Sequence, residues 1–188
     1  MKKNTEIIDI SNMKLVCYLY GIFNWIAPFL IQPEIVNTIY SVAISFVSTC
    51  LFIYIMLKFK GALNIILHSV KMDKVIGYLI YFSLIGYALN ILALRDPEGI
   101  LPYQAILGIG VVILYIVYGF FLKNLDAPLE KLKKVKSINI YANCVLISVV
   151  MAFTIIGVIF FIILMGVSYF ILGNIFVELQ ELELEERE

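Results

Sequence analysis

Uncharged polar side chains recur at helical spacing along several apolar stretches of the chain. Residues three or four positions apart share one face of a helix, so each set forms a narrow polar stripe. In lipid such a stripe either packs against another helix through hydrogen bonds or lines a path for a neutral or weakly polar solute. Both interpretations stay open. The residues of these candidate pathway or packing faces are Asn24, Thr38, Ser41, Ser45, Ser48, Ser83, Asn90, Gln104 and Tyr115.

Ionisable side chains, in contrast, are absent from the same apolar stretches. No Asp, Glu, Lys, Arg or His falls within any segment that we predict to span a membrane. Charged groups at membrane depth are costly and usually mark proton relays or ion paths. Their absence disfavours proton-coupled transport and catalysis by paired carboxylates. We therefore expect that the protein is not an enzyme and has no catalytic residues.

The histidine and the cysteines are too isolated to form a reactive site. His68 is the only histidine, and Cys17, Cys50 and Cys144 form no Cys-x-x-Cys pair. A metal centre or a thiol redox site needs such residues close together. We interpret His68 as a solvated surface residue and the cysteines as small apolar side chains. The sequence predicts no metal-binding residues, no cofactor-binding residues and no cofactor.

The overall composition places these residues in a membrane. Of the 188 residues, 62% are apolar or aromatic and 15% are charged, and the mean hydropathy is +0.99. Soluble domains are usually about 45 to 50% apolar and about 25% charged. The chain thus carries more apolar surface than one aqueous core can bury. This composition excludes disordered, collagen-like, disulfide-framework and nucleic-acid-binding proteins.

The gaps between charged residues locate the membrane-spanning helices. A run of about 20 apolar residues crosses a hydrocarbon core of about 30 Å. The uncharged stretch 137–177 is about twice as long, so we predict that it folds back near Gly157 into two spans. The predicted fold is all-α, a polytopic transmembrane helix bundle in a single membrane domain 1–188, with six spans favoured and five as the alternative. The six spans are 15–33, 35–57, 75–94, 100–122, 138–156 and 158–177.

The predicted spans repeat at an interval of about 60 residues. Helices that leave the basic side start near Leu15, Val75 and Ile138. This spacing predicts three successive helical hairpins in parallel orientation, as in transporters built from repeats. Any six-helix chain with short outer and long inner loops shows similar spacing, so the repeat has a simpler explanation as well.

Lysines gather in alternate connections and predict the orientation. Cytoplasmic loops carry an excess of Lys and Arg. The N-terminal tail and the connections after the second and fourth spans are basic, whereas the other connections contain one basic residue, Arg95. We therefore expect a multi-pass protein of the cell membrane with a cytoplasmic N-terminus. Tyrosines near these ends predict an interfacial aromatic belt: Tyr18, Tyr20, Tyr54, Tyr78, Tyr81, Tyr118 and Tyr141.

The two basic connections and the C-terminal tail carry helical patterns of their own. Segments 61–72 and 127–136 place apolar residues opposite polar ones, which predicts amphipathic helices on the inner leaflet. The acidic tail 178–188 repeats glutamates at helical spacing, and we expect it to extend the last helix into water. The lysines of the second connection would each attract anionic lipid by about 1 kcal/mol. They are Lys131, Lys133, Lys134 and Lys136.

Two functions fit these features. The first is a small, non-catalytic membrane protein that binds or passes a neutral or weakly polar solute as a transporter-type or channel-type subunit. The alternative is a non-transporting scaffold, assembly or immunity-type protein that recruits partners through its basic inner loop and acidic tail. The expected partners are the lipid bilayer, with anionic lipid at the inner face, and a second copy or another membrane subunit. Nucleic acid is not expected.

Overall fold

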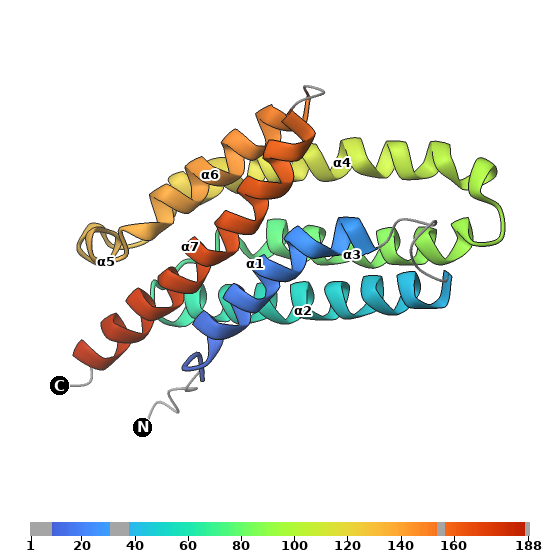
Figure 1. Cartoon of the computed structure of the whole chain (residues 1–188). Coiled ribbons are helices and arrows are strands. Elements are labelled where there is room, and N and C mark those ends of the chain that lie inside the picture. The colour runs from blue at the N-terminus through green and yellow to red at the C-terminus, as the bar shows by residue number, and fades with distance from the viewer. Residues whose placement is uncertain (1–8, 31–37, 154–156, 187–188) are drawn as a thin grey trace, which may run out of the picture.

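The chain is a bundle of helices in the computed structural model, which describes residues 9–30, 38–153 and 157–186 (Figure 1). No strand occurs among the described residues, so the predicted all-helical fold is confirmed. The helices are α1 (Met13–Leu30), α2 (Thr38–Ile65), α3 (Asp73–Ala93), α4 (Pro97–Lys123), α5 (Leu129–Lys134), α6 (Ser137–Ala152) and α7 (Gly157–Glu185).

Four of the described helices, α2, α3, α4 and α7, are long and apolar enough to cross a membrane. They point to a membrane location. The helices α1 and α6 are also apolar but shorter, with 18 and 16 residues. Each of the six predicted spans overlaps one of these helices, and only four of the described helices have the length and composition of a membrane span.

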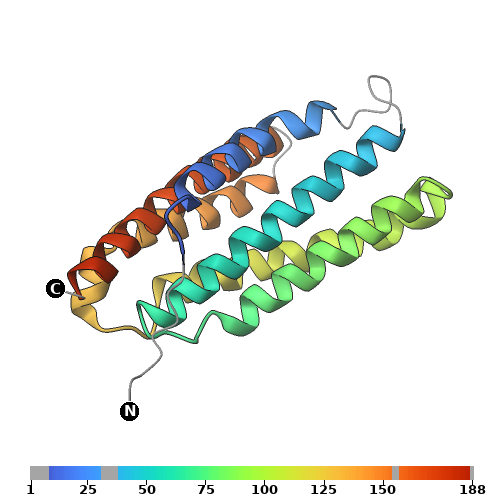
Figure 2. The same ribbon diagram turned by 90° about the horizontal axis from the view of Figure 1, so that it is seen from below.

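Six of the described helices, all except α5, pack in a closed ring. Along the chain α1 contacts α2, α2 contacts α3, α3 contacts α4, α4 contacts α6 and α6 contacts α7, and α7 returns to α1. In Figure 2 the helices α2, α3 and α4 form one side of the bundle and α1, α6 and α7 form the other. Each predicted hairpin is held together in this ring, and each is also joined to its neighbours. A threefold repeat therefore remains a prediction.

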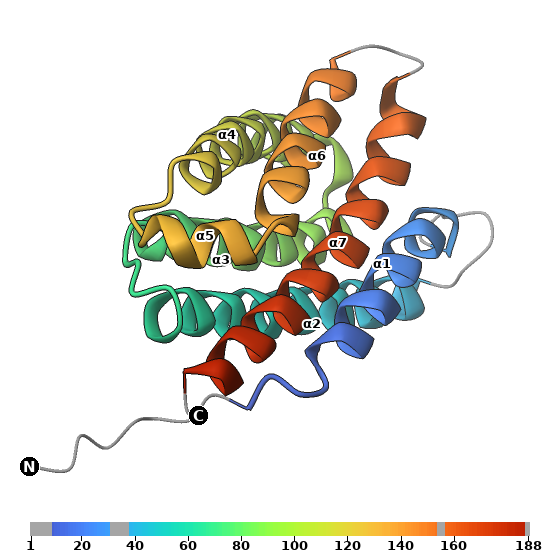
Figure 3. The same ribbon diagram turned by 90° about the vertical axis from the view of Figure 1, so that its left-hand side faces the viewer.

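One end of the bundle carries most of the lysines, and we call it the basic end. It comprises the α2–α3 connection at 66–72, the helix α5 and the end of α7 from Glu178 to Glu186. Figure 3 looks at this end and shows α5 lying across it. The stretch 137–177 does fold back, because α6 leads away from the basic end and α7 returns to it (Figure 1).

A layer of large aromatic side chains fills the bundle near the basic end. Phe59, Tyr118, Tyr141 and Phe176 come from four helices, and each is at most 2% exposed. Their rings meet edge to face, with centroids of Phe59 and Phe176 6.0 Å apart and those of Tyr118 and Tyr141 6.1 Å apart. The two tyrosine hydroxyls lie 3.2 Å apart and form a buried hydrogen bond. We call these four residues the aromatic layer, and it closes this half of the ring.

The prediction of a separate surface helix at 61–72 is wrong. The helix α2 continues through Lys58 and Lys60 to Ile65. These lysines can lie within an apolar helix because the long side chain packs along the helix while the ammonium group reaches a polar partner. Lys60 pairs with Asp73 at 3.6 Å. On the apolar face of the segment, Leu63, Ile66 and Leu67 are buried in the core, whereas Val70 is 70% exposed.

The tyrosines of the predicted aromatic belt divide into exposed and buried residues. Tyr54, Tyr78 and Tyr81 are at least 45% exposed, as an interfacial belt requires. Tyr118 and Tyr141 belong to the aromatic layer, and Tyr20 is also buried, at 4% exposure. The depth of a residue along the membrane follows from the sequence, but whether its side chain faces lipid or protein depends on the neighbouring helices. The belt prediction is therefore wrong for these three residues, all of them in the core.

The acidic tail does not simply extend into water. As expected it continues the last helix, since α7 runs to Glu185. However, Leu179 and Leu182 are buried in the core, and the glutamates on neighbouring positions bind the basic connection. The Glu178 carboxylate accepts hydrogen bonds from the Ser137 hydroxyl at 2.7 Å and from the Ser137 backbone N–H at 3.0 Å. The tail therefore packs as part of the bundle.

Helix ends follow local chemistry. The Asp96 carboxylate accepts a hydrogen bond from the Gly99 backbone N–H at 3.0 Å, and Pro97 fits the first helical position, so α4 begins there. After α2 the chain turns at His68, whose φ of 54° lies in the left-handed region that histidine tolerates better than most residues. His68 is exposed, in agreement with its interpretation as a surface residue.

Glycines bring α1 and α7 together. A Cβ atom on Gly21 would lie 2.9 Å from the backbone oxygen of Gly166, so the two helices approach closely there. Two polar contacts flank this approach. The Trp25 indole donates a hydrogen bond to the Ile163 carbonyl at 3.1 Å, and the Tyr18 hydroxyl donates to the Asn174 side chain at 2.9 Å. Gly21 and Gly166 therefore allow close packing of these two helices.

Candidate solute-binding cavity

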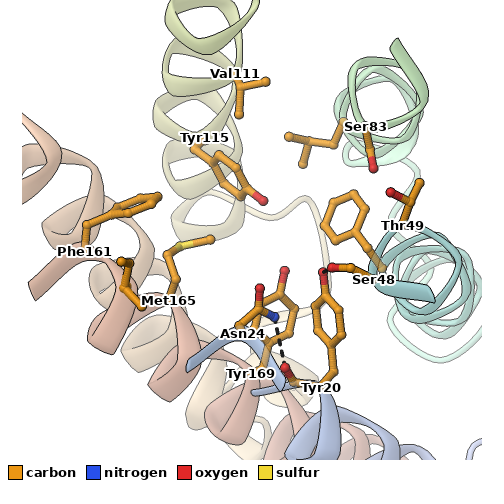
Figure 4. A pocket seen from close by; sticks show the side chains of 13 residues that line it. Tyr20, Asn24, Ser48, Thr49, Ser83, Val111, Tyr115, Phe161, Met165 and Tyr169 are labelled. Atoms are coloured by element: carbon orange, nitrogen blue, oxygen red, sulfur yellow. Dashed lines mark hydrogen bonds between the residues drawn. The ribbon is translucent and has the colours of Figure 1, made fainter. Parts of the chain in front are cut away.

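A cavity of about 350 Å³ lies inside the ring, on the side of the aromatic layer away from the basic end. Five helices contribute to its lining, and Figure 4 shows their side chains converging on one space. Tyr115 of α4 lies one helical turn from Tyr118 of the aromatic layer, and the two rings are 6.3 Å apart. The lining residues are Tyr20, Asn24, Ser48, Thr49, Phe52, Leu79, Ser83, Val111, Tyr115, Phe161, Ile162, Met165 and Tyr169.

Hydroxyl and amide groups supply the polar part of the lining. The hydroxyls of Tyr20 and Ser48 lie 3.5 Å apart. The Asn24 amide donates one hydrogen bond to the Tyr20 carbonyl at 2.9 Å, within its own helix. Ser83 and Tyr115 face the same space from α3 and α4 (Figure 4). The cavity can therefore offer hydrogen bonds from several sides without any charged side chain.

Apolar and aromatic side chains form the rest of the walls. Tyr20 and Tyr169 pack edge to face with ring centroids 4.6 Å apart, and together with Phe52 they form the floor next to the core. Met165 reaches in from α7 (Figure 4). Pockets of about 300 to 1,000 Å³ with aromatic walls and a few placed polar groups are typical of small-molecule sites. The chemistry of this lining suits a neutral molecule with an apolar body and hydrogen-bonding groups.

No family model, curated protein or solved structure matches this chain. The role of the cavity therefore has to be argued from its own residues.

Four of the residues singled out from the sequence meet in the cavity. Asn24, Ser48, Ser83 and Tyr115 come from four different helices and line one space. They occupy similar depths along their helices, which is why the ring brings them together. Whether they line a path for a solute, as the sequence suggested, stays a prediction.

The other candidate residues lie elsewhere. Ser41 and Ser45 are half-buried on α2 outside the lining. Gln104 donates a hydrogen bond to Asn90 at 3.1 Å, which joins α4 to α3 near their exposed ends. For this pair the packing interpretation fits. Thr38 begins α2, and its side chain lies outside the described residues.

Sequence reasoning missed the contribution of α7 to the cavity. Phe161, Met165 and Tyr169 recur every four residues and so share one face of that helix. This spacing was a usable signal, but apolar residues dominate the whole helix and hide it. Tyr20 was assigned to the aromatic belt for its depth alone.

Groups capable of metal or thiol chemistry do not gather near the cavity. Among the described residues, no three or more His, Cys, Asp or Glu lie close enough together to hold a metal ion. Cys17 and Cys144 are buried, Cys50 is exposed, and all three are free. The Cys144 thiol donates a weak hydrogen bond to the Leu164 carbonyl at 3.4 Å. Cys17 and Cys144 thus contribute to packing, whereas Cys50 does not.

Proposed function

We propose that this protein binds or passes a neutral or weakly polar solute through the cavity inside its helix ring, as a non-catalytic transporter-type or channel-type subunit. The observation that carries the proposal is the convergence of five helices on one space of about 350 Å³. Helices that merely pack would fill such a space with side chains, because close packing is what holds helices together in lipid.

The lining selects the class of solute. All thirteen residues around the cavity are uncharged, so a charged ligand would lose its hydration without gaining a counter-charge. Tyrosine, serine and asparagine side chains can hydrogen-bond hydroxyl, amide or ring nitrogen groups. The aromatic walls suit a flat or apolar body. A neutral molecule that combines both characters is the ligand this site fits.

Six membrane-spanning helices with a cytoplasmic N-terminus are part of the proposal. The shorter helices α1 and α6, of 18 and 16 residues, are about 27 and 24 Å long at about 1.5 Å per residue. A shortfall of a few ångströms against a core of about 30 Å is accommodated by local thinning of the bilayer. The lysines of the basic end would then face the cytoplasm, as the excess of positive charge in cytoplasmic loops requires.

This topology places the aromatic layer on the cytoplasmic side of the cavity. The buried rings of the aromatic layer lie between the cavity and the basic end, so in the proposed topology they separate the cavity from the cytoplasmic side. A solute would enter from the opposite side of the membrane. Passage would require the rings of Phe59, Tyr118, Tyr141 and Phe176 to move, whereas binding alone would not.

Recruitment of a partner through the basic loop and the acidic tail has weaker support. Lys134 pairs with Glu185, and Lys131 pairs with Glu186 at 2.5 Å, so these charges already bind each other. A partner would have to displace them. We therefore rank the scaffold function second.

A flux assay in vesicles tests the proposal. The full chain would be reconstituted into liposomes, and the uptake of radiolabelled glycerol, ribitol and uridine would be compared with uptake into protein-free vesicles. We expect at least one of these neutral solutes to enter faster with the protein, and Ser48→Phe and Ser83→Leu to abolish that gain by filling the cavity.

Ser41→Phe is the matched control, since Ser41 lies on the same helix as Ser48 but outside the cavity. It should fold and keep the wild-type flux. Equal flux in wild-type and empty vesicles, together with no rise in thermal stability with any of the three solutes, would contradict the proposal.

A further inference from the structure

A second pocket lies at the basic end, beneath the α4–α5 connection. Its volume is about 370 Å³, and it combines an apolar wall with lysines. No acidic side chain of the described residues lines it. The lining residues are Leu122, Lys123, Leu125, Leu129, Leu132, Lys133, Val135, Lys136, Ile138 and Asn139.

The structure divides the lysines of this region into two groups. Lys131 and Lys134 are bound by the end of α7, and Lys131 also donates a hydrogen bond to the Ile66 carbonyl at 2.7 Å. Lys123, Lys133 and Lys136 line the pocket, are exposed, and form no ion pair with any residue that the structure describes. Their positive charge is available to a ligand from outside the chain.

In the proposed topology this pocket lies at the level of the lipid headgroups. Lys123 follows the last apolar residue of α4, and Lys136 directly precedes α6. The apolar side of the pocket includes Leu129, which is 68% exposed, and Leu132 on α5. A leucine at that exposure beside a membrane gains contacts from an acyl chain, whereas in water it gains none.

We infer that this pocket binds one anionic phospholipid. The phosphate lies among Lys123, Lys133 and Lys136, and an acyl chain covers Leu129 and Leu132. Three unpaired ammonium groups around an apolar wall match both parts of such a molecule, whereas a free phosphate ion would use only the lysines. The inference rests on the membrane topology of the proposed function but not on the cavity, so a failure of the solute-flux assay would leave it standing.

Native mass spectrometry of the full chain in neutral detergent tests this inference. Phosphatidylglycerol and phosphatidylcholine with the same acyl chains would be titrated separately. We expect phosphatidylglycerol to bind more tightly and to a single site. Neutralising one pocket lysine, as in Lys133→Gln or Lys136→Gln, should weaken its binding about five-fold, which corresponds to about 1 kcal/mol per lysine near a membrane surface.

Lys74→Gln is the matched control, because Lys74 is an exposed lysine at the same end of the bundle but outside the pocket. It removes the same charge and should leave the affinity within two-fold of wild type. Lys133→Arg should keep most of the affinity. Thermal unfolding in phosphatidylcholine would show that each variant is folded.

Three outcomes would overturn the inference. They are equal affinity for the two lipids, equal weakening by Lys74→Gln and Lys133→Gln, and competition by inorganic phosphate at the same concentration as phosphatidylglycerol. The last result would indicate an anion site that does not recognise a lipid. A loss of lipid binding with unchanged solute flux would separate this site from the cavity.

Discussion

The two halves of the bundle differ in packing although both are strongly apolar. Toward the basic end, side chains of six helices interdigitate around the aromatic layer. In the opposite half α3 and α4 are loosely packed: no residue from Ile80 to Val117 is buried, whereas Ser148 and Val149 of α6 are. The cavity lies where these two halves meet.

This difference shows that apolar character alone does not create a core in a membrane. Lipid tails are as apolar as leucine, so helices associate through close contact and hydrogen bonds and not through the hydrophobic effect. Large rings such as Phe59 and Phe176 fill one half completely. In the other half, small side chains such as Ser48 and Ser83 leave space. The size of the inward-facing side chains therefore decides which half is closed and which can hold a solute.

Removing equivalent rings from one helix should give the clearest contrast between the halves. Phe59→Ala removes one of the four rings of the aromatic layer and should destabilise the protein by about 3 to 5 kcal/mol. Phe46→Ala, in the opposite half of α2, removes a ring that is 52% exposed and should cost less than about 1 kcal/mol. The free energy of unfolding of both variants would be measured in the same lipid or detergent. Equal losses would contradict the distinction between a packed and an open half.

Adding one methyl group to a glycine should distinguish the tight contact between α1 and α7 from an open position on α3. Gly21→Ala places a Cβ 2.9 Å from a backbone oxygen of α7 and should destabilise by about 1 to 3 kcal/mol. Gly77→Ala on α3 meets no atom within 4 Å and should change stability by less than about 1 kcal/mol. Thermal unfolding of the two variants provides the comparison. If Gly21→Ala leaves the stability unchanged, α1 and α7 are not tightly packed at this position.

Neutralising Glu178 should loosen the joint between α6 and α7 at the basic end. The carboxylate accepts two hydrogen bonds at the first turn of α6, where negative charge also favours the helix dipole. Glu178→Gln should cost about 1 to 2 kcal/mol. Glu181→Gln, an exposed position on the same helix, should change little. If the two variants unfold at the same temperature, this polar joint does not stabilise the packed half.

The smallest expected effect is a pH dependence at the same end. The hydrogen bond and the negative charge of Glu185 raise the pKa of Lys134 above its ordinary value of 10.5. Because the pKa is raised in the folded state, the contribution of this pair is complete below pH 10.5 and is lost as the pH rises through the folded pKa. Both side chains are more than half exposed, so the effect is small.

The difference in unfolding temperature between wild type and Lys134→Gln, measured from pH 8 upward, should shrink above pH 10.5. A difference that stays constant over this range would contradict the pairing.

The helix boundaries were largely predictable, and the exceptions have physical causes. Predicted spans such as 75–94 and 100–122 end within a few residues of α3 and α4, because charges mark where hydrocarbon ends. The helix α2 runs past the end of the predicted second span, since Lys58 and Lys60 lie inside it with their charged ends directed to polar partners. The segment around Leu63 was predicted to face lipid, although it is buried in protein. The spacing of apolar residues along a helix is the same in both cases, so the sequence cannot distinguish them.

For the candidate site, the sequence indicated the kind of residue but not the grouping. Ser48, Asn90 and Gln104 looked equivalent as polar residues at helical spacing. In the structure Ser48 lines the cavity, while Asn90 and Gln104 bond to each other. Which stripes meet depends on helix order and rotation, and neither follows from periodicity within one helix.

The sequence by itself determined that the chain is helical, that it belongs in a membrane and that its lysines gather at one end, because composition and periodicity are properties of each segment alone. Only the tertiary structure decided that the helices close into a ring and that Tyr20 and Tyr169 face a cavity. It also decided which lysines are paired: Lys131 and Lys134 form ion pairs, whereas the pocket lysines form none within the described residues. These features depend on side chains from distant segments that occupy the same depth and face each other, and that relation arises only when the helices pack.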